Sequence, residues 1–168
     1  MGTLRRADDR DVDALVRLRA LMLQAMGDDL GTPGWEAACR EALVRRLAEP
    51  ERFAAFVVDV DGAPVSCGVG WLEEHLPSPN QVDGRRGHIA SMSTDPAHRK
   101  RGHGRAVLQG LLGWFDDLRV VRIDLRATPQ GQPLYTSAGF RVLAGPTMAW
   151  TAPHVRPGLG FREPLSPR

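Results

Sequence analysis

Near the middle of the chain, a strand, a glycine-rich turn, a long amphipathic helix and a second strand follow one another. The first strand, at 87–94, stops at Asp95-Pro96, and the helix at 102–118 carries its apolar residues at helical spacing. Apolar and polar residues then alternate over 121–125, as they do in a half-buried strand. Two strands joined through a crossover helix run parallel, and the connection is right-handed in nearly all known cases. The segment therefore predicts a mixed α and β domain with a parallel strand pair.

The remaining segments predict antiparallel strands and further helices around this unit. Asp61-Gly62 is a hairpin turn signal between two apolar runs. In chain order, the additional expected elements are a strand at 3–7, a helix that begins at Asp8 or Asp9, a helix at 35–48, strands at 53–59 and 64–73, a short helix at 133–137, and strands at 140–143 and 147–151. We expect one α/β (α+β) domain over 1–151, with a mixed, mostly antiparallel sheet of about six to seven strands flanked by helices. A proline-rich tail at 152–168 follows it.

The composition is that of an ordinary globular protein. The chain has 168 residues, of which 42% are hydrophobic and 25% are charged, and this excludes a disordered or fibrous protein. Its formal net charge of +2 is too small to favour nucleic acid or a membrane surface as the main partner. No apolar run is long enough to span a bilayer, and residues 1–10 lack the apolar core of a secretory signal. We therefore expect a cytoplasmic protein.

The usage of cysteine and lysine agrees with this expectation. Cys39 and Cys67 belong to no paired motif, which disfavours both a disulfide framework and a metal site, so we expect two reduced, buried thiols and no metal. Lys100 is the only lysine among the 22 basic residues. We interpret this excess of arginine as the codon usage of a GC-rich bacterium, and it assigns no function by itself.

A basic, glycine-rich segment joins the first strand of the central unit to its helix. It reads Arg99-Lys100-Arg101-Gly102-His103-Gly104-Arg105. The free N–H groups and the positive end of a helix form an anion site, and glycine lets a phosphate approach the backbone closely. The spacing matches neither the dinucleotide fingerprint nor the P-loop. A solvated basic turn and a nucleic-acid patch are the alternatives, and the absence of interleaved aromatic residues weakens the second.

Two motifs in this part of the chain resemble those of a known family. Arg99-x-x-Gly102-x-Gly104 resembles the acyl-CoA pyrophosphate signature of the GNAT superfamily of N-acetyltransferases. Leu134-Tyr135-Thr136-Ser137-Ala138-Gly139-Phe140 resembles the second signature of that family, Leu-Tyr-x-x-x-Gly-Phe. The resemblance covers about 87–143, with both motifs in the family's order and a strand between them.

The resemblance implies acetyl-CoA, or a close acyl-CoA, as co-substrate. The fourth strand would splay from the fifth at a bulge, and the pantetheine arm would enter the gap between them. Backbone groups of Met92 and Thr94 would bond the pantetheine amides, and N–H groups from Arg99 to Arg105 would hold the pyrophosphate. Thr128 stands where the family often has an asparagine that touches the pantetheine, and its hydroxyl would replace that contact in part.

The resemblance also suggests an acid and a base for the reaction. Tyr135 is the only tyrosine, and as general acid its phenol would protonate the leaving thiolate; the alternative is a packed aromatic ring. His88 lies where some family members have a glutamate or histidine base, and an ordinary imidazole accepts a proton near neutral pH. Glu73 and Glu74 are its rivals, and a water-bound histidine at a strand edge is the alternative. His98 is expected to be a bystander.

The acceptor is the least defined part of this prediction. Asp28 and Asp29 lie between the first two helices, a loop that borders the acceptor site in the family and would suit a cationic amine; otherwise they are solvated loop acids. Trp35 and Trp71 would add a cation–π wall or pack in the core. We expect direct attack by a small primary amine on acetyl-CoA in a ternary complex. The alternatives are a non-catalytic acyl-CoA sensor and acetylation of protein amines. We expect neither nucleic acid nor a membrane as a partner. The sequence is compatible with a homodimer.

Overall fold

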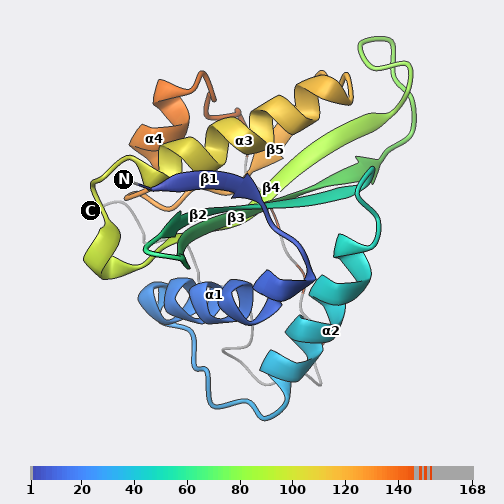
Figure 1. The fold of residues 1–168 in the computed structure, drawn as a ribbon. Helices are drawn as coiled ribbons and strands as arrows, with labels where there is room; N and C mark the ends of the chain where they lie inside the picture. The colour runs from blue at the N-terminus through green and yellow to red at the C-terminus, as the bar shows by residue number, and fades with distance from the viewer. Residues whose placement is uncertain (1, 146–147, 149, 151, 153–168) are drawn as a thin grey trace, which may run out of the picture.

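A five-stranded sheet separates two pairs of helices in this computed structural model, which describes residues 2–145, 148, 150 and 152 (Figure 1). The strands are β1 (Thr3–Arg6), β2 (Phe53–Val60), β3 (Ala63–Glu74), β4 (Arg85–Thr94) and β5 (Ile123–Leu125). The helices α1 (Val12–Met26) and α2 (Trp35–Leu47) cover one face, and α3 (His103–Asp117) and α4 (Gln132–Ser137) cover the other. Short 3-10 turns at Asp9–Asp11 and Pro96–His98 precede α1 and α3.

The sheet order is β1-β2-β3-β4-β5, with every neighbouring pair antiparallel except β4 and β5. The mixed domain and the parallel pair joined through α3 are thereby confirmed. The hairpin is also confirmed, because β2 and β3 pair across Asp61 and Gly62. Asp8 caps the 3-10 turn before α1, so the first helix begins slightly later than expected.

The expected sheet of six to seven strands was wrong, since the described residues form five. Residues 140–143 form no strand. Gly139 has a φ of 95°, and the Phe140 N–H bonds the Tyr135 carbonyl, which turns the chain back onto α4. Val142 and Leu143 are exposed, so their apolar character does not reflect pairing. The expected strand at 147–151 and the tail at 152–168 lie largely outside the described residues.

Two cores form, one on each face of the sheet. On the α3 face, Phe115 and Leu111 are fully buried beside Ile89. Phe115 packs directly on the sheet because Gly87 has no side chain there: a Cβ at Gly87 would lie 2.6 Å from the ring. On the other face, Leu18 of α1 packs with apolar residues of β2 and β3. The sheet is thus packed between two helix layers, each with its own core. Among the described residues, no helix is long and apolar enough to cross a membrane.

Candidate active site

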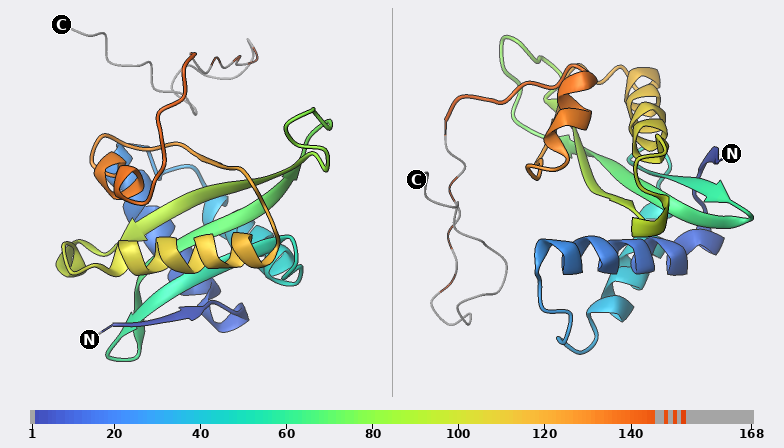
Figure 2. Two further views of the ribbon diagram at one scale, coloured as in Figure 1. Left: turned by 90° about the horizontal axis from the view of Figure 1, so that it is seen from above. Right: turned by 90° about the vertical axis from the view of Figure 1, so that its left-hand side faces the viewer.

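The parallel strands β4 and β5 separate after a short pairing. β5 pairs with Gly87, His88 and Ile89 of β4, and the pairing stops there although β4 runs on to Thr94. A bulge marks this point, because Ser91 has a φ of 52° and the β3–β4 register shifts opposite it. The view from above shows β4 passing between α3 and α4 (Figure 2). The second half of β4 therefore pairs with β3 on one edge, and its other edge is unpaired among the described residues.

The free edge of β4 presents backbone groups of Met92 and Thr94. The Asp95 N–H donates to the Val65 carbonyl of β3 at 2.8 Å. Because backbone groups alternate along a strand, those of Thr94 and Met92 point away from β3. The Arg99 Nε donates to the Thr94 carbonyl from that side. A chain-like ligand with amide groups could pair with this edge as a strand would.

The basic loop after β4 presents the uncapped end of α3 to the same space. Lys100 and Gly102 have φ values of 62° and 85°, and no side chain caps the first turn of α3. The leading N–H groups of the helix thus remain free for an anion. A Cβ at Gly104 would lie 3.7 Å from both Thr94 Oγ1 and Leu134 Cδ2. Gly104 therefore faces the space between β4 and α4, where a side chain would intrude.

His98 and His103 pack together in this loop with ring centroids 6.3 Å apart. Burial lowers the pKa of His103, and the nearby His98 and Arg101 lower it further. A neutral His103 can contribute its backbone N–H to an anion, but little charge. The positive charge of this loop comes from Arg99, Lys100, Arg101 and Arg105, which the sequence placed there.

Tyr135 lies on the buried side of α4 and belongs to the α3-face core. Its side chain is 8% exposed, and burial raises the pKa of its phenol. The ring meets Phe140 edge to face at 6.0 Å. No described residue hydrogen-bonds its hydroxyl. The ring of Tyr135 is thus held by packing, whereas its neutral hydroxyl is free to donate a hydrogen bond.

His88 lies on the opposite face of the sheet, at the last paired positions of β4. Its ring packs against Trp71 with centroids 4.5 Å apart, and its Nδ1 is 3.8 Å from Glu73 Oε1. The same carboxylate accepts from Trp71 Nε1 and contacts His75 Nε2, each at 3.2 Å. Glu74 is instead paired with Arg52 at 2.7 Å. The structure brings His88 and Glu73 together and engages Glu74 elsewhere.

A cavity of about 700 Å³ opens between α1, α2 and the sheet. Ala90 and Ser91 line it, so it reaches the bulge where β4 leaves β5. Trp35 and Trp71 also line it, whereas His88, Glu73 and Glu74 do not. Asp28 and Asp29 line its outer part and are exposed, and Asp29 Oδ1 accepts from the Gly31 N–H. The described residues hold no group of three or more side chains suited to a metal ion.

Sequence reasoning missed two arginines in this cavity, Arg19 of α1 and Arg46 of α2. Arg19 Nη1 donates to Ser91 Oγ, and the Arg46 guanidinium stacks on Trp71 and Phe53 at 5.3 and 5.7 Å. No local signal marked Arg19, because an arginine on an amphipathic helix is ordinarily solvated.

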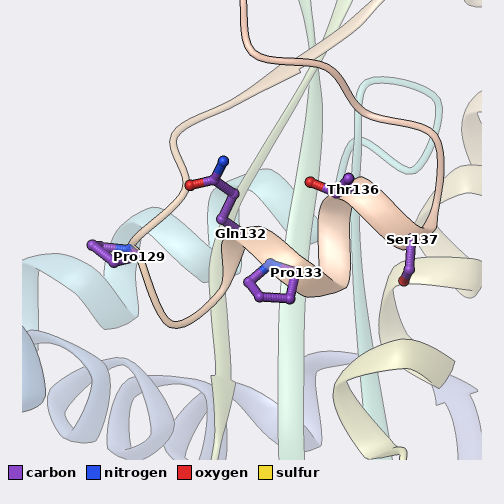
Figure 3. A pocket seen from close by; sticks show the side chains of 5 residues that line it. All are labelled: Pro129, Gln132, Pro133, Thr136 and Ser137. Atoms are coloured by element: carbon purple, nitrogen blue, oxygen red, sulfur yellow. The ribbon is translucent and has the colours of Figure 1, made fainter.

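A second hollow, of about 470 Å³, lies on the solvent side of α4 (Figure 3). It is lined by Pro129, Gln132, Pro133, Thr136 and Ser137. Tyr135 does not line it. Thr128 directly precedes Pro129 in the chain. Its hydroxyl accepts a hydrogen bond from the Gly131 N–H at 3.1 Å, which fixes the turn into α4.

Three comparisons place the chain among known proteins. A model described as the acetyltransferase (GNAT) family matches residues 18–140. Mycothiol acetyltransferase of Saccharomonospora viridis is 33% identical over 114 residues, which are 68% of this chain and 34% of that protein. The chain thus spans about a third of the length of that relative.

Two solved structures share the fold over nearly their whole length. A predicted acetyltransferase from Clostridium acetobutylicum, crystallised with acetyl-CoA, has a TM-score of 0.81 at 21% identity, over 89% of this chain and 96% of that one. A GCN5-related N-acetyltransferase from Ralstonia eutropha JMP134 has a TM-score of 0.79 at 27% identity, over 89% of this chain and 99% of that one.

Proposed function

Because the chain belongs to the GNAT family of acetyltransferases, we propose that it transfers the acetyl group of acetyl-CoA to the primary amine of a small molecule. The observation that carries this proposal is the free edge of β4 beside the uncapped end of α3. The amide groups of a pantetheine arm can hydrogen-bond to the free edge of β4. The negative charge of a pyrophosphate suits the free N–H groups at the start of α3. Gly104 supports the fit, since a Cβ there would lie 3.7 Å from Thr94 and Leu134 and would narrow the space between β4 and α4.

The two faces of the sheet give the substrates separate entrances. The co-substrate would lie between α3 and α4, with backbone groups of Met92 and Thr94 along its arm and N–H groups from Arg99 to Arg105 at its phosphates. The acceptor would enter the cavity on the α1–α2 face. Ser91 lines that cavity and sits at the bulge, so the two paths meet there. A cavity of about 700 Å³ that is lined mainly by apolar side chains suits a small acceptor.

The proposed reaction forms a C–N bond as the C–S bond of the thioester breaks. The amine loses one proton and the CoA sulfur gains one, so an acid and a base balance the step. Tyr135 would donate its phenolic proton to the sulfur, supported by its neutral, unengaged hydroxyl. His88 would receive the amine proton through water, because it does not line the cavity that would hold the acceptor, and Glu73 would stabilise the resulting imidazolium. Attack is direct, with both substrates bound and no acetyl-enzyme.

Replacing His88 tests the assignment of the base. Alkyl amines are mostly protonated at neutral pH, with a pKa of about 10.4 for a lysine-like group. His88→Gln should therefore lower kcat/KM about 10²-fold near pH 7. The deficit should shrink toward alkaline pH, where more acceptor arrives deprotonated. Rates of CoA thiol release across the pH range measure this dependence.

His75→Gln is the matched control for that experiment. It removes the other imidazole that contacts the Glu73 carboxylate, outside the β4–β5 junction. Its pH profile should follow that of the wild type. An unchanged rise with pH in His88→Gln would instead assign the base to Glu73 or the rise to ionisation of the acceptor itself, and Glu73→Gln would separate these two.

A further inference from the structure

The cavity between α1, α2 and the sheet has an apolar wall and a small number of charges. Its apolar and aromatic lining includes Trp35, Leu43, Phe53, Trp71 and Ala90. Ligand pockets are typically lined by apolar and aromatic side chains, with a few polar groups that fix the orientation of the ligand. The charged groups are two arginines, Arg19 and Arg46, and two aspartates at the outer part. Their positions decide which acceptor fits.

Arg19 lies where the cavity meets the bulge of β4. It is half-buried in the middle of α1, and its Nη1 donates to the hydroxyl of Ser91. Among the described residues, it forms no salt bridge, and no other acceptor receives its remaining N–H groups. Arg17 on the same helix, by contrast, pairs with Asp95. A partly desolvated guanidinium with free N–H groups is suited to a carboxylate, which it binds through two parallel hydrogen bonds.

Arg46 has a different setting. It is exposed, and its guanidinium lies over the rings of Trp71 and Phe53, so it extends the aromatic wall. Asp28 and Asp29 are exposed as well, and one oxygen of Asp29 caps a backbone N–H. Solvent screens these exposed charges more strongly than it screens Arg19. Arg19 is therefore the charge that dominates at the reaction end of the cavity.

We propose that the acceptor is an amino acid-like amine, with a carboxylate that binds Arg19 and an apolar body that packs on the wall around Trp71. This inference rests on the proposed acetyl transfer and adds the class of acceptor. Ser91 brings Arg19 to the point where the amine must meet the thioester, so carboxylate and amine lie a few bonds apart. A polyamine would meet the positive charge of Arg19 at that point and is disfavoured.

Three compounds with the same ring test this class: phenylalanine, phenylalaninamide and phenethylamine. They keep the apolar body and the amine, and they change the carboxylate to a neutral amide or to hydrogen. The measured quantity is kcat/KM from CoA thiol release, corrected for the fraction of free amine. We expect phenylalanine to exceed the two neutral compounds by roughly tenfold to a hundredfold, the range of a hydrogen-bonded charge pair.

Variants of Arg19 separate recognition from intrinsic reactivity. Arg19→Met should remove the preference for the carboxylate while acetyl-CoA still raises the Tm, and Arg19→Lys should restore part of it. Arg45→Met is the matched control, since Arg45 is exposed on α2 and does not line the cavity. It should keep the full preference. A preference that survives in Arg19→Met would overturn the role of Arg19.

A binding readout keeps this inference separate from catalysis. Cys39 lines the cavity and is partly accessible. Phenylalanine should slow its alkylation by iodoacetamide more than phenethylamine does, and Arg19→Met should abolish that difference. Thiol release with phenethylamine or spermidine but not with phenylalanine would overturn the amino acid class and leave acetyl transfer standing. Absence of thiol release with every amine, despite protection of Cys39 by phenylalanine, would overturn the acetyl transfer and leave the binding class standing.

Discussion

Tyr135→Phe should lower kcat about 10²-fold or more while leaving the binding of acetyl-CoA unchanged. The substitution keeps the ring that packs in the α3-face core beside Phe140 and removes the hydroxyl alone. That hydroxyl bonds no described residue, so its loss leaves no buried partner unsatisfied and costs little stability. The thiolate would then leave without its acid. Steady-state thiol release and a thermal shift with acetyl-CoA measure the two effects separately.

The alkaline side of the pH profile gives Tyr135 a second test. A general acid must be protonated, so activity falls as pH rises through its pKa. Burial raises the pKa of Tyr135 above the usual value for tyrosine of about 10, and the wild type should keep its activity until the pH exceeds that value. Tyr135→Phe should lack this fall. Thr136→Val, which removes the next hydroxyl on the solvent side of α4, should behave as the wild type. Wild-type turnover in Tyr135→Phe would assign the residue to packing.

Gly104→Val should abolish the stabilisation of the protein by CoA or acetyl-CoA. A ligand at 100 times its dissociation constant stabilises the native state by about 2.7 kcal/mol, which corresponds to roughly 5–10 °C in Tm for a chain of this size. The valine side chain would occupy the space between β4 and α4 that the pyrophosphate needs. A Cβ at Gly104 meets its neighbours only at ordinary contact distance, 3.7 Å, and the melt of the unliganded variant checks that it folds. Thermal melts with and without ligand give the shift.

Gly113→Val supplies the control on the same helix. Gly113 is exposed, and a Cβ there meets nothing within 4 Å. The substitution makes the same change of residue type on the same helix, without any contact to the proposed cradle. It should keep the full ligand-induced shift. An undiminished shift in Gly104→Val would remove the pyrophosphate from the start of α3.

The sequence predicted correctly the elements that depend on local patterns alone. The apolar face of α3 and the turn at Asp61-Gly62 are encoded within a few residues, and both formed as expected. Strand formation at 140–143 depends on a distant partner, and the apolar residues there could not reveal that none pairs with them. The bulge at Ser91 is similar: its residues are ordinary, and the family resemblance alone suggested it.

The cavity between α1, α2 and the sheet depends on packing between segments far apart in the chain. Tyr135 and the basic loop could be found because short motifs carry them. Arg19 could not, because an arginine on a helix is usually solvated, and this chain is rich in arginine. The role proposed for Arg19 depends on the packing of α1 across β4, which sets its guanidinium beside Ser91.

The most direct measurement of acetyl transfer combines thiol release with identification of the product. Acetyl-CoA is incubated with the protein and a panel of small primary amines, the CoA thiol is followed with a thiol reagent, and the amine is analysed by mass spectrometry. We predict thiol release that requires an amine, matched by equal formation of its N-acetyl derivative and nearly lost in Tyr135→Phe. Stabilisation by acetyl-CoA without thiol release in the presence of any amine would contradict this account and indicate a protein that binds acyl-CoA without turnover.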